Sequence, residues 1–279
     1  MAVLLGFFVA MAFGAGDFVG GRASMHASTS AVLVVSQSVG VIGSLVIALL
    51  VGARVAPHDL VLGACAGAST AVGLGLLYRG LATAAMGVVA PVTAVVAAGV
   101  PVGWGLAGGE RPSALVLTGI VIAVGVGAAI AREPGARTER FAPGVVAAAA
   151  AGAALGGSLV LLSETSPASG MWPVFAARAA GFAVAVAGVA VFRIRHEIRF
   201  PRGRALAYAF IAGTLDVTAT SLLLLAVRKG LISVVAGVAA LAPGFTVLLA
   251  WAVLREHLRT EQRIAIAAAL VGLVLVATG

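Results

Sequence analysis

Residues 230–257 read GLISVVAGVAALAPGFTVLLAWAVLREH: a glycine, an apolar run that contains Pro243, and a polar turn around Glu256. Residues 80–111, GLATAAMGVVAPVTAVVAAGVPVGWGLAGGER, have the same plan, with two prolines in the apolar run and Glu110 in the turn. Another apolar run follows each stretch. The sequence therefore predicts a duplicated membrane unit with a broken helix in each copy.

The composition places the chain in a membrane. Of its 279 residues, 61% are hydrophobic and only 10% are charged, and the mean hydropathy is +1.14. A soluble domain has too few polar residues at this composition to cover its apolar surface. Runs of about 20 apolar residues, each long enough to cross about 30 Å of hydrocarbon as a helix, recur along the chain. We expect an all-α, polytopic membrane protein.

The net charge of +8 does not indicate a nucleic-acid partner, because the basic residues are nearly all arginines between apolar runs without interleaved aromatic residues. The single cysteine, Cys65, lies inside an apolar run, so it can form neither a disulfide within the chain nor a thiolate metal site with other cysteines. No cofactor or metal motif is present. The first run, from Met1 to Ala12, is interpreted as part of a membrane span rather than as a signal peptide.

Ten membrane spans are predicted, five in each half of the chain. They cover Ala2–Gly20, Thr29–Val51, Leu60–Tyr78, Ala82–Ala107, Ser113–Ala131, Ala142–Ser163, Met171–Phe192, Ala205–Val227, Leu231–Leu254 and Ile264–Thr278. Because five is odd, two copies in one chain must run in opposite directions. We therefore expect two inverted five-helix repeats, residues 1–131 and 142–279, joined by a polar linker at 132–141.

Pairs of matching positions support the duplication. A shift of 141 residues pairs Asp17 with Ser158 and Gln37 with Arg178, and a shift of 150 pairs Thr70 with the threonine at position 220. Glycines also recur four residues apart within the spans, as at 63 and 67, a spacing that favours close packing of helices in lipid.

The chain resembles EamA-type transporters of the drug/metabolite transporter superfamily. The resemblance is carried by the glycine-rich first span, with FGAGDFVGGR at residues 13–22, and by the two units that run from proline to glutamate. The second unit matches better, with RKGL at 228–231, ALAPGFTV at 240–247 and LREHL at 254–258. In the first unit either Pro91 or Pro101 could correspond to Pro243. The resemblance implies a transporter that exports metabolites or amino acids, rather than an enzyme.

Polar residues inside predicted spans are the candidates for a substrate or coupling-ion site, since such residues are costly in hydrocarbon. They are Asp17, Gln37, Thr70, Arg178, Asp216 and Thr220. Asp216 is the candidate for binding a proton or a substrate amine, and Arg178 the candidate for a carboxylate. Alternatively, the two form a structural ion pair.

Three prolines are candidates for helix breaks or gates: Pro91, Pro101 and Pro243. Each removes a helical hydrogen bond and frees a carbonyl that could bind substrate, although a static kink is the alternative. Glu110 and Glu256 are expected to accept hydrogen bonds from helix starts rather than to bind substrate.

The sequence thus predicts a secondary transporter of a small polar or amphipathic metabolite, such as an amino acid or a drug-like compound. It would work by alternating access, with possible coupling to protons, in the inner membrane of a bacterium. The alternatives are a membrane-embedded enzyme that acts on lipid and a non-transporting membrane subunit. The expected partners are a small-molecule substrate and the bilayer, and a monomer is compatible with the sequence. The distribution of arginines between loops predicts that both termini lie outside, whereas members of the resembling family are drawn with both inside.

Overall fold

The computed structural model describes residues 1–83, 86–130, 141–193, 198–254, 264, 267–268, 271–272 and 274–275. Its helices are α1 (Ala2–Ser24), α2 (Thr29–Val51), α3 (Pro57–Thr83), α4 (Met86–Ala107), α5 (Ala114–Ile130), α6 (Phe141–Ser163), α7 (Trp172–Arg193), α8 (Arg204–Lys229), α9 (Ile232–Ala239) and α10 (Ala242–Leu254), with a short 3-10 helix, η1 (Pro167–Ser169), before α7. The described residues contain no strand, so the predicted all-α class is confirmed.

Seven segments of the described chain are long and apolar enough to cross a membrane: Ala2–Ser24, Ser30–Val51, Pro57–Leu76, Val146–Ser163, Trp172–Ala190, Arg204–Lys229 and Ile232–Val253. Two shorter apolar helices, Val92–Ala107 and Ala114–Gly125, match the fourth and fifth predicted spans. Of the predicted tenth span, only residues 264, 267–268, 271–272 and 274–275 are described, all of them helical.

The predicted ninth span is not one helix but two, α9 and α10, separated at residues 240–241. Pro243 has no N–H and so cannot donate the helical hydrogen bond to the carbonyl of Ala239. Instead, the N–H of Gly244 donates to the carbonyl of Leu241 at 2.9 Å. Pro243 thus lies in the first turn of α10, where a proline is tolerated.

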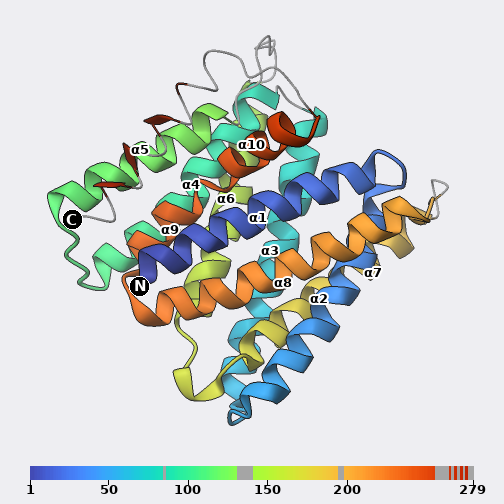
Figure 1. Cartoon of the computed structure of the whole chain (residues 1–279), viewed down its shortest axis with the longest axis horizontal. Helices are drawn as coiled ribbons and strands as arrows, with labels where there is room; N and C mark the ends of the chain where they lie inside the picture. Colours follow the sequence, from blue (N-terminus) through green and yellow to red (C-terminus); the bar gives the residue numbers. More distant parts are fainter. Residues whose placement is uncertain are drawn as a thin grey trace.

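The helices of the two halves pack in matching pairs. α1 lies along α8, and correspondingly α6 lies along α3. α2 packs on α8, and correspondingly α7 packs on α3. α9 and α10 pack on α1, and correspondingly α4 packs on α6. Figure 1 shows the first of these pairs, α1 in blue beside α8 in orange. Each contact becomes its counterpart when α1, α2, α3 and α4 are exchanged for α6, α7, α8 and the α9–α10 segment.

The same exchange is visible in single residues where α2 meets α7. Gly40 of α2 faces the side chain of Arg178 of α7, and Gly181 of α7 faces the side chain of Gln37 of α2. The C-terminal end of α2 packs against the N-terminal end of α7, so the two helices are antiparallel. Reciprocal contacts between antiparallel helices are typical of a two-fold relation, in which residue i contacts j and j contacts i.

Glycines let α3 approach α7 until the backbones touch. A Cβ added to Gly63 would collide with backbone atoms of Pro173, and one added to Gly67 would collide with backbone atoms of Ala177. Gly213 of α8 faces the backbone of Ser36 in α2 in the same way. Such close approach gains van der Waals contact that lipid cannot replace.

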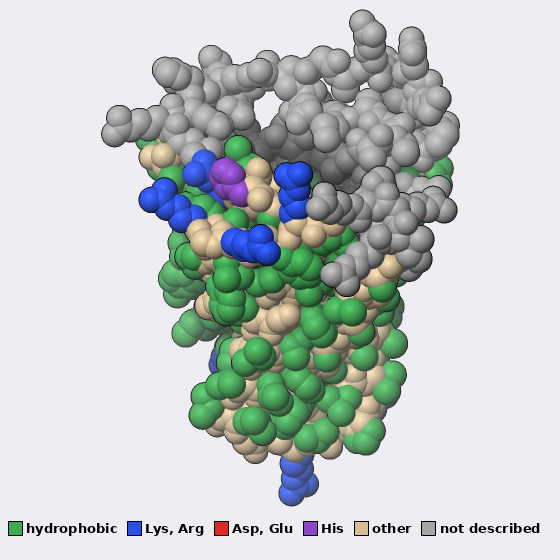
Figure 2. All heavy atoms as spheres, turned by 90° about the vertical axis from the view of Figure 1, so that its right-hand side faces the viewer, with side chains coloured by type: hydrophobic (Ala, Val, Ile, Leu, Met, Phe, Trp, Pro, Cys, Tyr) green, Lys and Arg blue, Asp and Glu red, His purple; other side chains and the backbone are tan. Residues whose placement is uncertain are grey.

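The two ends of the bundle differ in charge. Figure 2 shows basic side chains and a histidine gathered near one end, above a side surface that is mostly hydrophobic. The described cations of the end where α1 finishes and α8 begins are Arg22, Arg199, Arg202 and Arg204, and Ser28 joins the two segments through two hydrogen bonds with Arg199. The hydrophobic sides fit lipid contact, and the polar ends fit the membrane interfaces.

Candidate transport site

An ion pair between α7 and α8 forms the centre of the candidate site. One terminal nitrogen of Arg178 donates to Asp216 Oδ2. The other donates to Asp216 Oδ1 at 3.3 Å, to the Asp216 carbonyl at 3.3 Å and to the Thr220 hydroxyl. The Arg178 side chain is 11% exposed and that of Asp216 is 35% exposed. A guanidinium bound at two points to a carboxylate holds both side chains in fixed orientations.

Gln37 extends the site across to the other half of the chain. Its Oε1 accepts from Arg178 Nη1 at 3.4 Å, which joins α2 to α7 at the reciprocal contact described above. The absence of side chains at Gly40 and Gly181 leaves room for these two long side chains to pass each other. The Nε of Arg178 is buried without a hydrogen-bond acceptor among the described residues.

Asp17 lies close to this ion pair on α1. Its neighbour Gly16 packs against the Cβ of Leu215 and approaches the backbone nitrogen of Asp216. The segment of α1 that carries Asp17 therefore packs against the segment of α8 that carries Asp216. Four helices, α1, α2, α7 and α8, approach each other here. The residues that they bring together are Asp17, Gln37, Arg178, Asp216 and Thr220.

Among the described residues, no hydrogen bond joins Thr70 to this cluster. Its hydroxyl donates to the carbonyl of Ala66 in its own helix at 3.0 Å. In the second half, the hydroxyl of Thr220 donates to the carbonyl of Asp216 at the same distance. The paired positions therefore share a local geometry, but only the second one also contacts Arg178.

The three candidate prolines lie in different surroundings. α4 is a single helix across both Pro91 and Pro101, so these two residues do not interrupt it as a break would require. Among the described residues around the three prolines, a helix is interrupted only just before Pro243, between α9 and α10. Next to that interruption, the hydroxyl of Thr246 in α10 donates to the Gly14 carbonyl in α1 at 3.0 Å.

Sequence reasoning missed the partner of Glu110. This glutamate was expected to accept hydrogen bonds at a helix start, and it does so at the start of α9, in the other half of the chain. Its carboxylate accepts from the N–H of Ile232 at 2.6 Å and from the N–H of Ser233 at 3.1 Å, and also from the Ser233 hydroxyl. Glu256 lies outside the described residues.

A second cluster that sequence reasoning missed closes the same end of the bundle. Arg228 donates to the carbonyls of Gly170 and Ser166 in the α6–α7 loop, at 2.7 and 2.9 Å. The buried side chain of Asp59, at the start of α3, accepts from the hydroxyl of Ser169 in the same loop. No local signal in the sequence points to this loop as the partner of Arg228.

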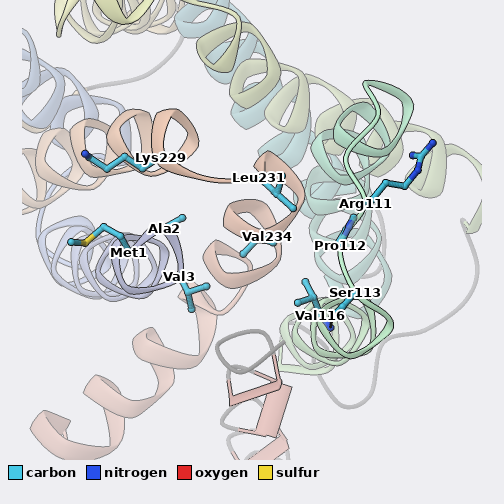
Figure 3. Close-up of a pocket in the computed structure, with 10 residues that line it drawn as sticks. All are labelled: Met1, Ala2, Val3, Arg111, Pro112, Ser113, Val116, Lys229, Leu231 and Val234. Carbon is cyan, nitrogen blue, oxygen red and sulfur yellow. Dashed lines mark hydrogen bonds between the residues drawn. The ribbon is translucent and has the colours of Figure 1, made fainter.

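A pocket of about 380 Å³ opens at this end, between the start of α1, the α4–α5 turn and α9. Figure 3 shows Arg111 and Lys229 at opposite sides of it, with the apolar side chains of Leu231 and Val234 between them. None of the polar candidates predicted from the sequence lines this pocket. The candidate site is therefore the cluster around Arg178, which lies within the apolar helices and not in this pocket.

Apolar helices around a polar centre define the class of this chain as a multi-pass membrane protein. Residues 142–278 match the model of the EamA-like transporter family. The chain therefore carries an EamA-like unit over its second half, and its resemblance to the drug/metabolite transporter superfamily is confirmed.

The fold has a counterpart among solved structures. The chain is similar to one described as "Crystal structure of protein", with a TM-score of 0.78 and 14% sequence identity, over 99% of this chain and 96% of that chain. At this identity the similarity concerns the fold. No curated protein matches the chain.

Proposed function

We propose that the chain is a secondary transporter that exports a small polar or amphipathic metabolite, such as an amino acid or a drug-like compound, across a bacterial plasma membrane. The observation that carries this proposal is the polar cluster of Asp17, Gln37, Arg178 and Asp216, which lies inside four apolar helices, away from the helix ends. Ionisable residues at membrane depth are typical of substrate and ion pathways. The EamA-like match of the second half agrees with this function.

We further propose that transport proceeds by alternating access between two inverted five-helix repeats, residues 1–131 and 142–279. The exchanged helix pairs and the antiparallel, reciprocal contact of α2 with α7 support this arrangement. In such folds, the substrate site lies near the bilayer midplane where the repeats meet, often beside interrupted helices. The contact between Gln37 and Arg178 lies at that junction, and the α9–α10 interruption supplies the broken helix.

Uptake by proteoliposomes tests the proposal. The purified protein is reconstituted and screened with radiolabelled amino acids, sugars and cationic drugs, against empty liposomes. The double variant Arg178→Gln with Asp216→Asn removes the ion pair without leaving a charge unpaired, and we expect it to insert normally but to lose uptake. Thr118→Ala is the matched control, because this exposed hydroxyl bonds only to the carbonyl of Ala114 in its own helix among the described residues.

Two results would count against the proposal, the first against transport itself and the second against the site assigned to it. One is a screen in which no compound enters faster than into empty liposomes. The other is a double variant that transports as fast as the control. The second result would retain the transporter but remove the Arg178 cluster from its mechanism.

A further inference from the structure

Four arginines form a cationic patch at the end of the bundle where α1 finishes and α8 begins. They are Arg22, Arg199, Arg202 and Arg204. Two hydrogen bonds between Ser28 and Arg199 hold the α1–α2 loop against the segment before α8. Next to these loops, Ala23, Val32 and Ala209 form one buried cluster, so the end of α1 and the starts of α2 and α8 are neighbours. The fold therefore brings cations from two separate segments to one surface.

The cationic patch has no anionic partner among the described residues. The only ion pair in the described part of the chain joins Arg178 to Asp216, and none of the four guanidinium groups donates to a described residue. In the sequence, residues 193–204 contain five arginines and one glutamate, which leaves an excess of four positive charges. No side chain caps the start of α2 or of α8, so both helix dipoles add partial positive charge here.

Exposed apolar side chains lie beside these cations. Phe200 follows Arg199 and is 44% exposed, and Met25 in the α1–α2 loop is 70% exposed. Further exposed apolar residues follow Arg204 along α8. They are Leu206, Phe210 and Ile211. Figure 2 shows the basic side chains at this end above a surface that is mostly hydrophobic. Cations at a membrane interface with apolar side chains below them match an amphiphile that has an anionic head.

We propose that the cationic patch binds the headgroup of an anionic phospholipid, with the phosphate held by the arginines and an acyl chain lying along the exposed apolar residues of α8. Guanidinium groups bind phosphate oxygens through paired, charge-assisted hydrogen bonds. A free phosphate would contact only the cations, whereas a lipid also covers the apolar side chains. The distribution of arginines places this end at the cytoplasmic leaflet, whose surface is negative. The inference concerns the lipid-facing surface and is independent of the compound that is transported.

Native mass spectrometry of the full-length protein, freed of lipid in detergent, tests this inference. The protein is mixed with equal amounts of phosphatidylglycerol and phosphatidylcholine that have identical acyl chains, so that the two lipids differ in headgroup charge. The wild-type protein should retain at least fivefold more phosphatidylglycerol than phosphatidylcholine. Glycerol 3-phosphate, added at the concentration of the lipid, should not displace the bound phosphatidylglycerol, because it makes no apolar contact.

Three multiple variants assign the binding to the cationic patch. Glutamine at positions 199, 202 and 204 should abolish the preference for phosphatidylglycerol, and lysine at the same positions, which keeps the charge, should retain most of it. The matched control removes three positive charges at the opposite end of the bundle and should keep the full preference. It combines Arg54→Gln, Arg111→Gln and Lys229→Gln.

Equal binding of the two lipids by the wild-type protein would overturn the inference. A glutamine variant of the patch that still prefers phosphatidylglycerol would also overturn it, and so would a control that loses as much preference as that variant. Displacement of the lipid by glycerol 3-phosphate would assign the patch to a soluble phosphate and would overturn its assignment to lipid. If the glutamine variant does not fold, the lipid comparison and the displacement on the wild-type protein still decide.

Discussion

Replacement of Glu110 gives the sharpest test of how the two halves are held together, because its carboxylate caps a helix of the other half. Glu110→Ala removes the acceptor for the N–H groups of Ile232 and Ser233 and for the Ser233 hydroxyl. Loss of a helix cap costs about 1 kcal/mol. Loss of the negative charge beside the helix N-terminus adds about 0.5 kcal/mol, and the hydroxyl bond to a charged group adds about 1.5 kcal/mol. We therefore expect a loss of about 3 kcal/mol in the free energy of unfolding.

The assay is reversible unfolding of the full-length protein in mixed micelles of dodecyl maltoside and SDS. Glu110→Gln keeps one acceptor oxygen without the charge, so about half of the loss should remain. Glu164→Gln is the control, because Glu164 is exposed and accepts a single bond, from Trp104 Nε1 at 2.8 Å, so its loss should stay below about 1 kcal/mol. In a double-mutant cycle, Ser233→Ala should show a coupling of about 1 kcal/mol to Glu110→Ala.

The reasoning would be refuted if Glu110→Ala cost no more than the Glu164 control, or if Ser233→Ala and Glu110→Ala were additive. Either result would mean that the cap seen in the structure does not contribute to the union of the halves.

Three further predictions concern the spans and their orientation. Asp216→Asn alone leaves the largely buried Arg178 unpaired and should destabilise the protein by about 3 kcal/mol. Arg178→Gln leaves the more exposed Asp216 unpaired and should cost less. The double variant should lose less than the sum of the two, and an additive double variant would argue against the ion pair. Gly67→Ala places a Cβ against the backbone of α7 and should cost about 1–3 kcal/mol in the same unfolding assay. Gly75→Ala, whose added Cβ meets no atom within 4 Å, should be nearly neutral. Equal effects would contradict the close approach of α3 and α7. The excess of arginines at one end predicts outside termini, so alkaline phosphatase fused to the C-terminus should be active and a fluorescent fusion dark, and the reverse pattern would show that the charge count misleads.

The sequence by itself determined the helical class and most of the span positions. An apolar run of about 20 residues can satisfy its backbone hydrogen bonds in lipid only as a helix, so composition and length are sufficient to predict it. The ends of α2 and of α6 agree with the predicted spans within a residue. The second EamA-like unit was also readable from its motifs, because a family pattern is a property of the sequence. The sequence also singled out Asp17, Arg178 and Asp216, since charged residues inside apolar runs are conspicuous without any structure.

What the tertiary structure decided is which of these residues meet. Arg178 and Asp216 are 38 residues apart, and the sequence left open whether they pair or bind substrate; the packing of α7 beside α8 brings them together. That pairing gives Asp216 a cation, whereas no described side chain forms an ion pair with Asp17. The cap between Glu110 and α9 spans more than a hundred residues and depends on how the halves dock. Hydrocarbon forces each span to satisfy its backbone alone, so its sequence reports its own helix, whereas side-chain partners depend on which helices become neighbours.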